Sequence, residues 1–143
     1  MQSNDEHIQL LISQLITFGK KRIGFLGLAF KEGTDDLRES PIVEVIERMI
    51  GKGFSVSIYD KNVKLSNLIG ANRAFIEKEI PHIGRLIRET VDKVVQDSEV
   101  IVVSQKNEGL SELPGMIKEQ IVVDLIGAIK SPASVNGQYY RFC

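Results

Sequence analysis

The fold is decided by two apolar runs and the helix between them, which begin with Arg22-Ile-Gly-Phe-Leu-Gly27 and close with Phe54-Ser-Val-Ser-Ile-Tyr-Asp60. The first run ends in glycine and is typical of a strand buried on both faces of a parallel sheet. Ser40-Pro41 predicts a helix start, because serine is a good N-cap and proline loses no needed N–H at the first helical position. This order predicts a right-handed βαβ unit.

The rest of the chain continues the same alternation. Thr90 is expected to cap a helix over Val91–Ser98, and Val100–Val103 reads as another buried strand. A further strand is predicted over Ile121–Val123, ending at Asp124, and Tyr139–Phe142 is expected to add an edge strand. The pattern predicts an α/β fold, a Rossmann-like three-layer domain with a mainly parallel sheet.

The amino-terminal segment is predicted to be an amphipathic helix. Asn4 or Asp5 is expected to cap its start and Gly19 to close its end. The apolar side chains recur at helical spacing on one stripe: Ile8, Leu11, Ile12, Leu15 and Ile16. We interpret residues 1–19 as the end of a connecting helix and residues 20–143 as the domain that follows it.

Length and composition describe one ordinary soluble domain. The chain has 143 residues, of which 43% are hydrophobic and 26% charged, and its net charge of −1 offers no field for nucleic acid or anionic membranes. The basic triplet Lys20-Lys21-Arg22 reads as solvated charge ahead of a strand. No apolar run approaches the roughly 20 residues that span a bilayer, and the polar, acidic start is unlike a signal peptide. We expect a cytoplasmic protein with no membrane or nucleic-acid partner.

The residues provide no metal site and no disulfide. Cys143 is the single cysteine, and no cluster of Cys and His has metal-ligand spacing. No general base adjoins Cys143 in the sequence, so we interpret it as an incidental thiol and assign no catalytic residue.

The segment after the first strand carries the candidate ligand site. It reads Gly-Leu-Ala-Phe-Lys-Glu-Gly-Thr-Asp-Asp-Leu-Arg-Glu-Ser-Pro over residues 27–41, which we call the signature segment. Ligands of doubly wound sheets bind beyond the carboxyl ends of the strands. Gly24 and Gly27 are three apart and Phe30 takes the next step, so the G-x-G-x-x-G fingerprint of dinucleotide binding is absent.

Two cations and an aromatic ring in this segment suit an anionic, partly flat ligand such as a nucleoside diphosphate. Lys31 offers a point charge, Arg38 a planar guanidinium that can bind phosphate through two hydrogen bonds, and Phe30 a flat apolar surface beside the ligand. The alternative for each residue is structural: Phe30 as core, and the two cations paired with acidic neighbours in the segment. The residues alone leave both interpretations open.

The signature segment closely resembles a motif of the UDP-glucose/GDP-mannose dehydrogenase family, in the carboxyl-terminal domain. Matching G-L-x-F-K-x-x-T-D-D-x-R-x-S-P is far more specific than a glycine motif. Ile58–Val63, Gly70–Arg73 and Ile80–His82 resemble the GDP-mannose 6-dehydrogenase branch, whereas UDP-glucose enzymes more often place proline where Lys61 stands. The resemblance covers about residues 20–130.

The resemblance implies an enzyme that oxidises the C6 alcohol of a nucleotide sugar to a carboxylate, with two NAD⁺ and a cysteine thioester. By this resemblance Phe30 and Lys31 contact the nucleotide sugar, and Arg38 reaches towards the phosphates of NAD. The full-length enzyme is expected to be a homo-oligomer that converts GDP-mannose to GDP-mannuronate.

Two family features are missing, and they limit what the chain can do alone. The nucleophile's G-x-C-x-P context and the NAD fingerprint do not occur here. We therefore expect a piece of a longer enzyme, inactive without the amino-terminal domain. The alternatives are a UDP-glucose or other UDP-sugar 6-dehydrogenase domain, a stand-alone nucleotide-binding module, and an assembly domain that works through its first helix.

Overall fold

A computed structural model describes the sheet, its flanking helices and their core. The described residues are 2–28, 41–60, 78, 81–104, 113, 117–127 and 138–141, with no side-chain description for residues 2–5. Five strands form one sheet in the order β2-β1-β3-β4-β5, and every neighbouring pair is parallel. The strands are β1 Arg22–Leu26, β2 Ser55–Tyr59, β3 Val100–Val103, β4 Ile121–Asp124 and β5 Gln138–Arg141.

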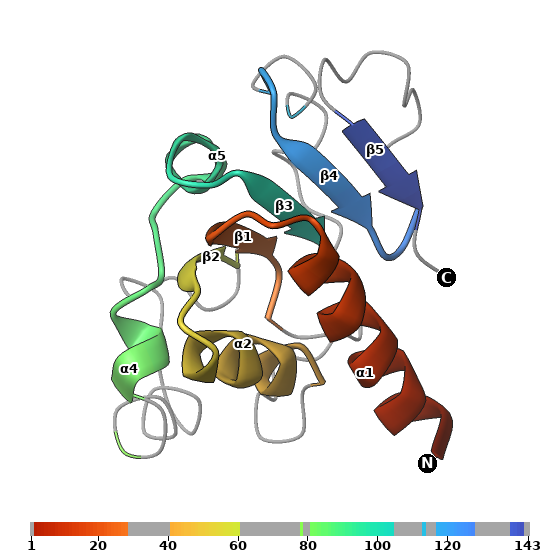
Figure 1. Cartoon of the computed structure of the whole chain (residues 1–143). Coiled ribbons are helices and arrows are strands. Elements are labelled where there is room, and N and C mark those ends of the chain that lie inside the picture. Colours follow the sequence, from red (N-terminus) through yellow and green to blue (C-terminus); the bar gives the residue numbers. More distant parts are fainter. Residues whose placement is uncertain are drawn as a thin grey trace.

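Helices cover both faces of this sheet. Figure 1 shows α1 and α2 on one side of the strands and α5 on the other. The helices with printed bounds are α1 Gln2–Thr17, α2 Pro41–Gly51, α4 Pro81–Gly84 and α5 Val91–Gln96. The predicted Rossmann-like three-layer α/β fold is therefore confirmed, and its sheet is parallel throughout the described strands.

The strand order places a topological switch point beside β1. Strand β1 pairs with β2 on one side and β3 on the other, so Leu26 has Tyr59 and Val103 as register partners. The chain goes from β1 to one neighbour and then returns past β1 to the other. In doubly wound sheets a crevice opens at the carboxyl ends of two such strands, because their helices lie on opposite faces.

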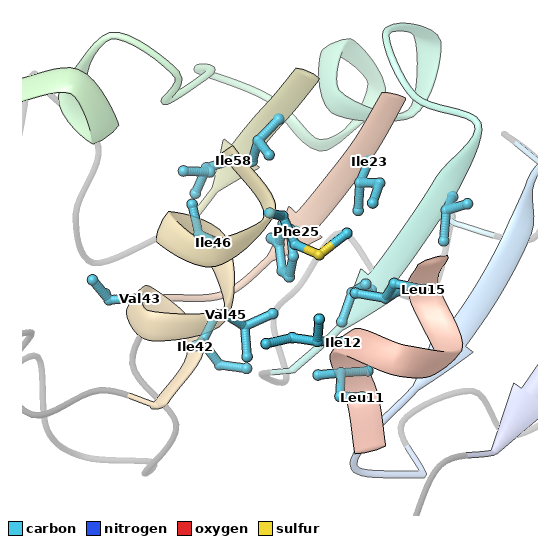
Figure 2. Packing of buried hydrophobic residues seen from close by; sticks show 14 of the residues in the cluster. Leu11, Ile12, Leu15, Ile23, Phe25, Ile42, Val43, Val45, Ile46 and Ile58 are labelled. Carbon is cyan, nitrogen blue, oxygen red and sulfur yellow. The ribbon is translucent and has the colours of Figure 1, made fainter. Parts of the chain in front are cut away.

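The larger core joins α1 and α2 to one face of the sheet. Figure 2 shows Leu15 and Ile12 of α1 and Ile46 of α2 directed towards Phe25 of β1. Leu15, Ile46 and Phe25 are fully buried, and burying each such side chain contributes about 1.5–3 kcal/mol. The helix α1 therefore packs on the same core as the domain behind it.

The predicted stripe and cap of α1 need two corrections. Ile16 was expected on the buried stripe but is 42% exposed, because it lies at the end of the helix beyond the sheet-facing turn. The helix begins at Gln2, so Asn4 and Asp5 lie inside it and not at its N-cap. Gly19 ends the segment as expected: its φ is +69° and its N–H donates to the carbonyl of Ile16.

The other predicted elements are found with small shifts in their bounds. Thr90 is the N-cap of α5, but its side chain makes no capping hydrogen bond, and α5 ends at Gln96. The edge strand β5 runs from Gln138 to Arg141. The expected N-cap Ser40 lies outside the described residues. Ile87 forms a parallel bridge with Ile58, which adds backbone hydrogen bonds at the outer side of β2.

The second face of the sheet approaches α5 closely at Gly24. A Cβ on Gly24 would lie 2.5 Å from Ser98 Oγ and 2.5 Å from Val94 Cγ1, so only glycine fits without movement. Both Val94 and Ser98 are buried. Gly24 therefore sets the distance between β1 and the layer that contains α5.

Replacing Gly24 by alanine is expected to destabilise the chain by about 1–3 kcal/mol, because the added methyl overlaps packed atoms. The free energy of unfolding in urea measures this change. Gly51→Ala is the matched control: a Cβ at Gly51 meets nothing within 4 Å, so stability should stay the same or rise slightly. Equal stability of the parent and Gly24→Ala would contradict the close-packing account.

Glu99 fastens the amino end of β1 to the segment that leads into β3. Its carboxylate accepts hydrogen bonds from the backbone N–H groups of Lys21 and Arg22, and the Arg22 Nε lies 3.6 Å from it. Burial alone raises the pKa of Glu99, but these hydrogen bonds and the Arg22 charge outweigh it and hold the pKa below its usual range.

A lowered pKa in the folded state means that Glu99 stabilises the fold above its unfolded pKa of about 4.3, and that this stabilisation is lost as the pH falls through the folded value. Glu99→Gln should therefore reduce the free energy of unfolding at pH 7 and make little difference near pH 3. Chemical denaturation at both pH values tests this. The control Glu119→Gln should show no such pH-dependent difference.

Candidate functional site

The four residues singled out from the sequence all fall in parts of the chain that the structure leaves undescribed. Phe30, Lys31, Arg38 and Cys143 lie outside the described ranges. Both ends of the signature segment are described, however. It leaves β1 through Gly27 and Leu28 and enters α2 at Pro41.

Gly27 and Leu28 are held by β2 as they leave the sheet. The Gly27 N–H donates to the carbonyl of Tyr59 at 2.8 Å, and the Leu28 N–H donates to Asp60 Oδ2 at 2.7 Å. Gly27 has a φ of +120°, which favours glycine at this turn. The Leu28 side chain is fully buried in the α1/α2 core. The start of the signature segment is therefore fixed by backbone and side chain.

Ser104 holds the same point from the β3 side. Its hydroxyl lies 2.8 Å from the carbonyl oxygen of Gly27 and 3.2 Å from that of Leu26. The hydroxyl has one hydrogen to donate, so the shorter contact, to Gly27, is the stronger one. Ser104 and Asp60 are both about 1% exposed. Water is excluded from these contacts, which makes an unsatisfied partner costly.

The carboxyl end of β4 has its own polar group, the fully buried Asp124. Its Oδ2 accepts a hydrogen bond of 2.7 Å from the Tyr139 hydroxyl, and its Oδ1 accepts one of 3.1 Å from the Ile126 N–H. Arg141 donates to the Asp124 carbonyl at 3.2 Å, and its guanidinium also lies against Gly127. This cluster links β4 and β5 and shapes the turn that follows β4.

The connection after β1 lacks the sequence fingerprint of a dinucleotide site. A dinucleotide fingerprint requires a glycine-rich turn that brings the first helix directly against the pyrophosphate. The sequence after β1 has no G-x-G-x-x-G motif, and α2 begins only at Pro41. The sequence of this connection therefore lacks the motif through which a dinucleotide is usually held.

The opposite edge of the sheet carries a mixed-charge cavity of about 440 Å³, lined in part by Arg22, Glu99, Lys118 and Gln120. Its polar groups are largely bonded to one another: Glu99 accepts from the start of β1, and Gln120 accepts from the Lys118 N–H and donates to Val95. This cavity lies at the amino ends of the strands, away from the switch point. It fits an edge braced by internal contacts better than a ligand site.

Within the described part of the chain, no group of three or more His, Cys, Asp and Glu side chains is arranged to hold a metal ion. In the same residues, no helix has the length and apolar character needed to cross a membrane.

Sequence reasoning gave no role to Asp60, Ser104 or Asp124. Each stands at or directly after the last residue of a buried strand, and each is buried itself. The available sequence signal for these residues was a single polar residue at the end of each apolar run. It marked where each strand ends, but the partners of these side chains depend on which strands become neighbours.

Five parallel strands, helices on both faces and a switch point beside β1 define a doubly wound α/β domain, the fold class in which ligands bind where the strand order reverses. The model of the UDP-glucose/GDP-mannose dehydrogenase family, UDP binding domain, matches residues 24–131. The chain belongs to this family, as the resemblance of the signature segment implied.

Individual relatives agree with this family. GDP-mannose 6-dehydrogenase of Pseudomonas aeruginosa is 40% identical over 100% of this chain, which covers 33% of that protein. The Azotobacter vinelandii enzyme of the same name is 41% identical over 89% of this chain, which covers 29% of that protein. UDP-glucose 6-dehydrogenase of Rickettsia bellii is 26% identical over 98% of this chain, which covers 33% of that protein.

Solved structures give the same result for the fold. A crystal structure of a ternary complex of GDP-mannose dehydrogenase from Pseudomonas aeruginosa matches with a TM-score of 0.84 and 36% identity, over 97% of this chain and 32% of that one. A UDP-glucose dehydrogenase from Pyrobaculum islandicum matches in fold, with a TM-score of 0.61 and 23% identity, over 97% of this chain and 29% of that one. The chain thus spans about a third of the length of these relatives.

The Asp124 cluster leads to a stability prediction. Tyr139→Phe removes the hydroxyl that donates to a fully buried carboxylate, and should lower the free energy of unfolding by about 1–3 kcal/mol. Tyr140→Phe is the matched control, since its hydroxyl bonds the exposed Gln138 side chain and should contribute under about 0.5 kcal/mol. Similar losses in both variants would contradict the importance of the Asp124 contact.

Proposed function

We propose that this chain is the nucleotide-sugar-binding, carboxyl-terminal domain of an NAD-dependent nucleotide-sugar 6-dehydrogenase. The substrate of the full-length enzyme is GDP-mannose and its product GDP-mannuronate. The observation that carries the proposal is the position of the signature segment: it leaves the sheet at the β1/β3 switch point, where ligands of this fold class bind. Relatives at 37–41% identity that bear the name GDP-mannose 6-dehydrogenase support the choice of substrate.

In this proposal Phe30 and Lys31 contact the nucleotide sugar, and Arg38 contacts the phosphates of the cofactor. NAD⁺ supplies the hydride acceptor for the oxidation at C6. The sequence from β1 to α2 has no G-x-G-x-x-G motif, so NAD is held mainly by an amino-terminal domain. The nucleophile belongs to that part of the enzyme as well, and residues 1–143 alone are inactive.

The proposal also covers the wider organisation of the protein. Residues 1–19 form the end of a connecting helix and residues 20–143 the binding domain, although α1 packs on the same core. The full-length enzyme is a cytoplasmic homo-oligomer. Its other partners are the nucleotide sugar and its own amino-terminal domain.

A UDP-sugar substrate is the second candidate, favoured by the family model, whose description is a UDP binding domain. Calorimetric titration of GDP and of UDP into the chain separates the two candidates. We expect tighter binding of GDP. Tighter binding of UDP would select the second candidate, and no binding of either nucleotide would count against both.

Lys31→Ala should weaken GDP binding by roughly tenfold or more, because a charge-assisted contact contributes about 1.5–3 kcal/mol. The thermal unfolding midpoint should stay within a few degrees of the parent's. Lys52→Ala is the control, since Lys52 follows α2 at the amino edge of the sheet and should leave GDP affinity unchanged. Unchanged affinity in Lys31→Ala would remove this residue from the site.

A further inference from the structure

The chain that leaves β1 is bonded by side chains from both neighbouring strands, at the point where the sheet's own hydrogen bonds end. On the β2 side, Asp60 accepts from the Leu28 N–H. On the β3 side, the Ser104 hydroxyl donates to the Gly27 carbonyl. We call these two side chains, with Gly27 and Leu28, the exit clamp.

The exit clamp is made of groups that are expensive to bury. Asp60 and Ser104 are each about 1% exposed, and a buried carboxylate or hydroxyl costs free energy unless it is hydrogen-bonded. An apolar residue at either position would cover the end of the sheet but would leave the Leu28 N–H or the Gly27 carbonyl without this hydrogen bond. The polar side chains set the direction in which the chain leaves β1, because each one holds a backbone group of the residues that follow the strand.

Ser98, which lies before the amino end of β3, provides a contrast with Ser104. It precedes β3 as Ser104 follows it, and it is also buried, yet its hydroxyl has no hydrogen-bond partner among the described residues. A buried serine at an end of β3 therefore does not by itself bond the neighbouring strand. The contact of Ser104 is specific to the carboxyl edge, where the signature segment begins.

We propose that Asp60 and Ser104 are positioning residues of the nucleotide-sugar site, holding the first residues of the signature segment so that Phe30 and Lys31 start from a fixed point. This inference rests on the proposed function. Because Gly27 and Leu28 are already held before the ligand arrives, less conformational entropy is lost on binding, so the exit clamp raises affinity without touching the ligand.

The test compares Ser104→Ala with Ser98→Ala in the full chain, at a temperature well below both unfolding midpoints. Ser104→Ala should weaken GDP binding roughly fivefold to tenfold by calorimetry and speed amide hydrogen exchange in the peptide covering residues 27–33. Ser98→Ala should change neither quantity. A role confined to stability would lower the unfolding midpoint of Ser104→Ala and leave the GDP affinity of the folded chain unchanged, and that result would overturn the proposal.

Asp60 gives an independent second test. Asp60→Ala removes the acceptor for the Leu28 N–H and should also weaken GDP binding, whereas Asp60→Asn keeps a carbonyl oxygen there and should restore much of it. Equal affinity in the parent, Asp60→Ala and Ser104→Ala would refute the positioning role while leaving the proposed function intact. Failure of the parent itself to bind GDP or UDP would refute the proposed function, and this inference with it.

Discussion

Strand β1 lies between β2 and β3, and the chain leaving it is hydrogen-bonded to both neighbours through Gly27, Leu28, Asp60 and Ser104. This arrangement needs a parallel sheet, because only there do the carboxyl ends of adjacent strands meet at one edge. It also needs helices on opposite faces, so that no crossover covers the edge between β1 and β3. The two core clusters that seat α1 and α2 on one face and α5 on the other maintain both conditions.

The two edges of the sheet use polar residues differently. At the amino edge, Glu99 and Gln120 bond nearby backbone groups and brace the starts of β1 and β4. At the carboxyl edge, Asp60, Ser104 and Asp124 are buried and fix the directions in which segments leave the strands. In doubly wound domains the amino edge of the sheet usually contributes to stability, and the connections at the carboxyl edge usually bind the ligand.

Membership of the UDP-glucose/GDP-mannose dehydrogenase family is consistent with a sequence that has no G-x-G-x-x-G motif after β1. The chain shares the fold of these relatives and spans about a third of their length.

The sequence by itself determined the element order, the parallel sheet and the family, because apolar runs, glycines and the signature segment are local signals. It was wrong for Ile16, which has the helical spacing of the buried stripe but is exposed at the end of α1. It was also wrong for the start of α1, because the helix begins before the two residues expected to cap it. The roles of Phe30, Lys31 and Arg38 remain predictions from the sequence. Only the tertiary structure decided that Asp60 and Ser104 bond the chain at Gly27 and Leu28. A buried polar side chain finds its partner on the strand beside it, and no single segment of the sequence determines the order of the strands.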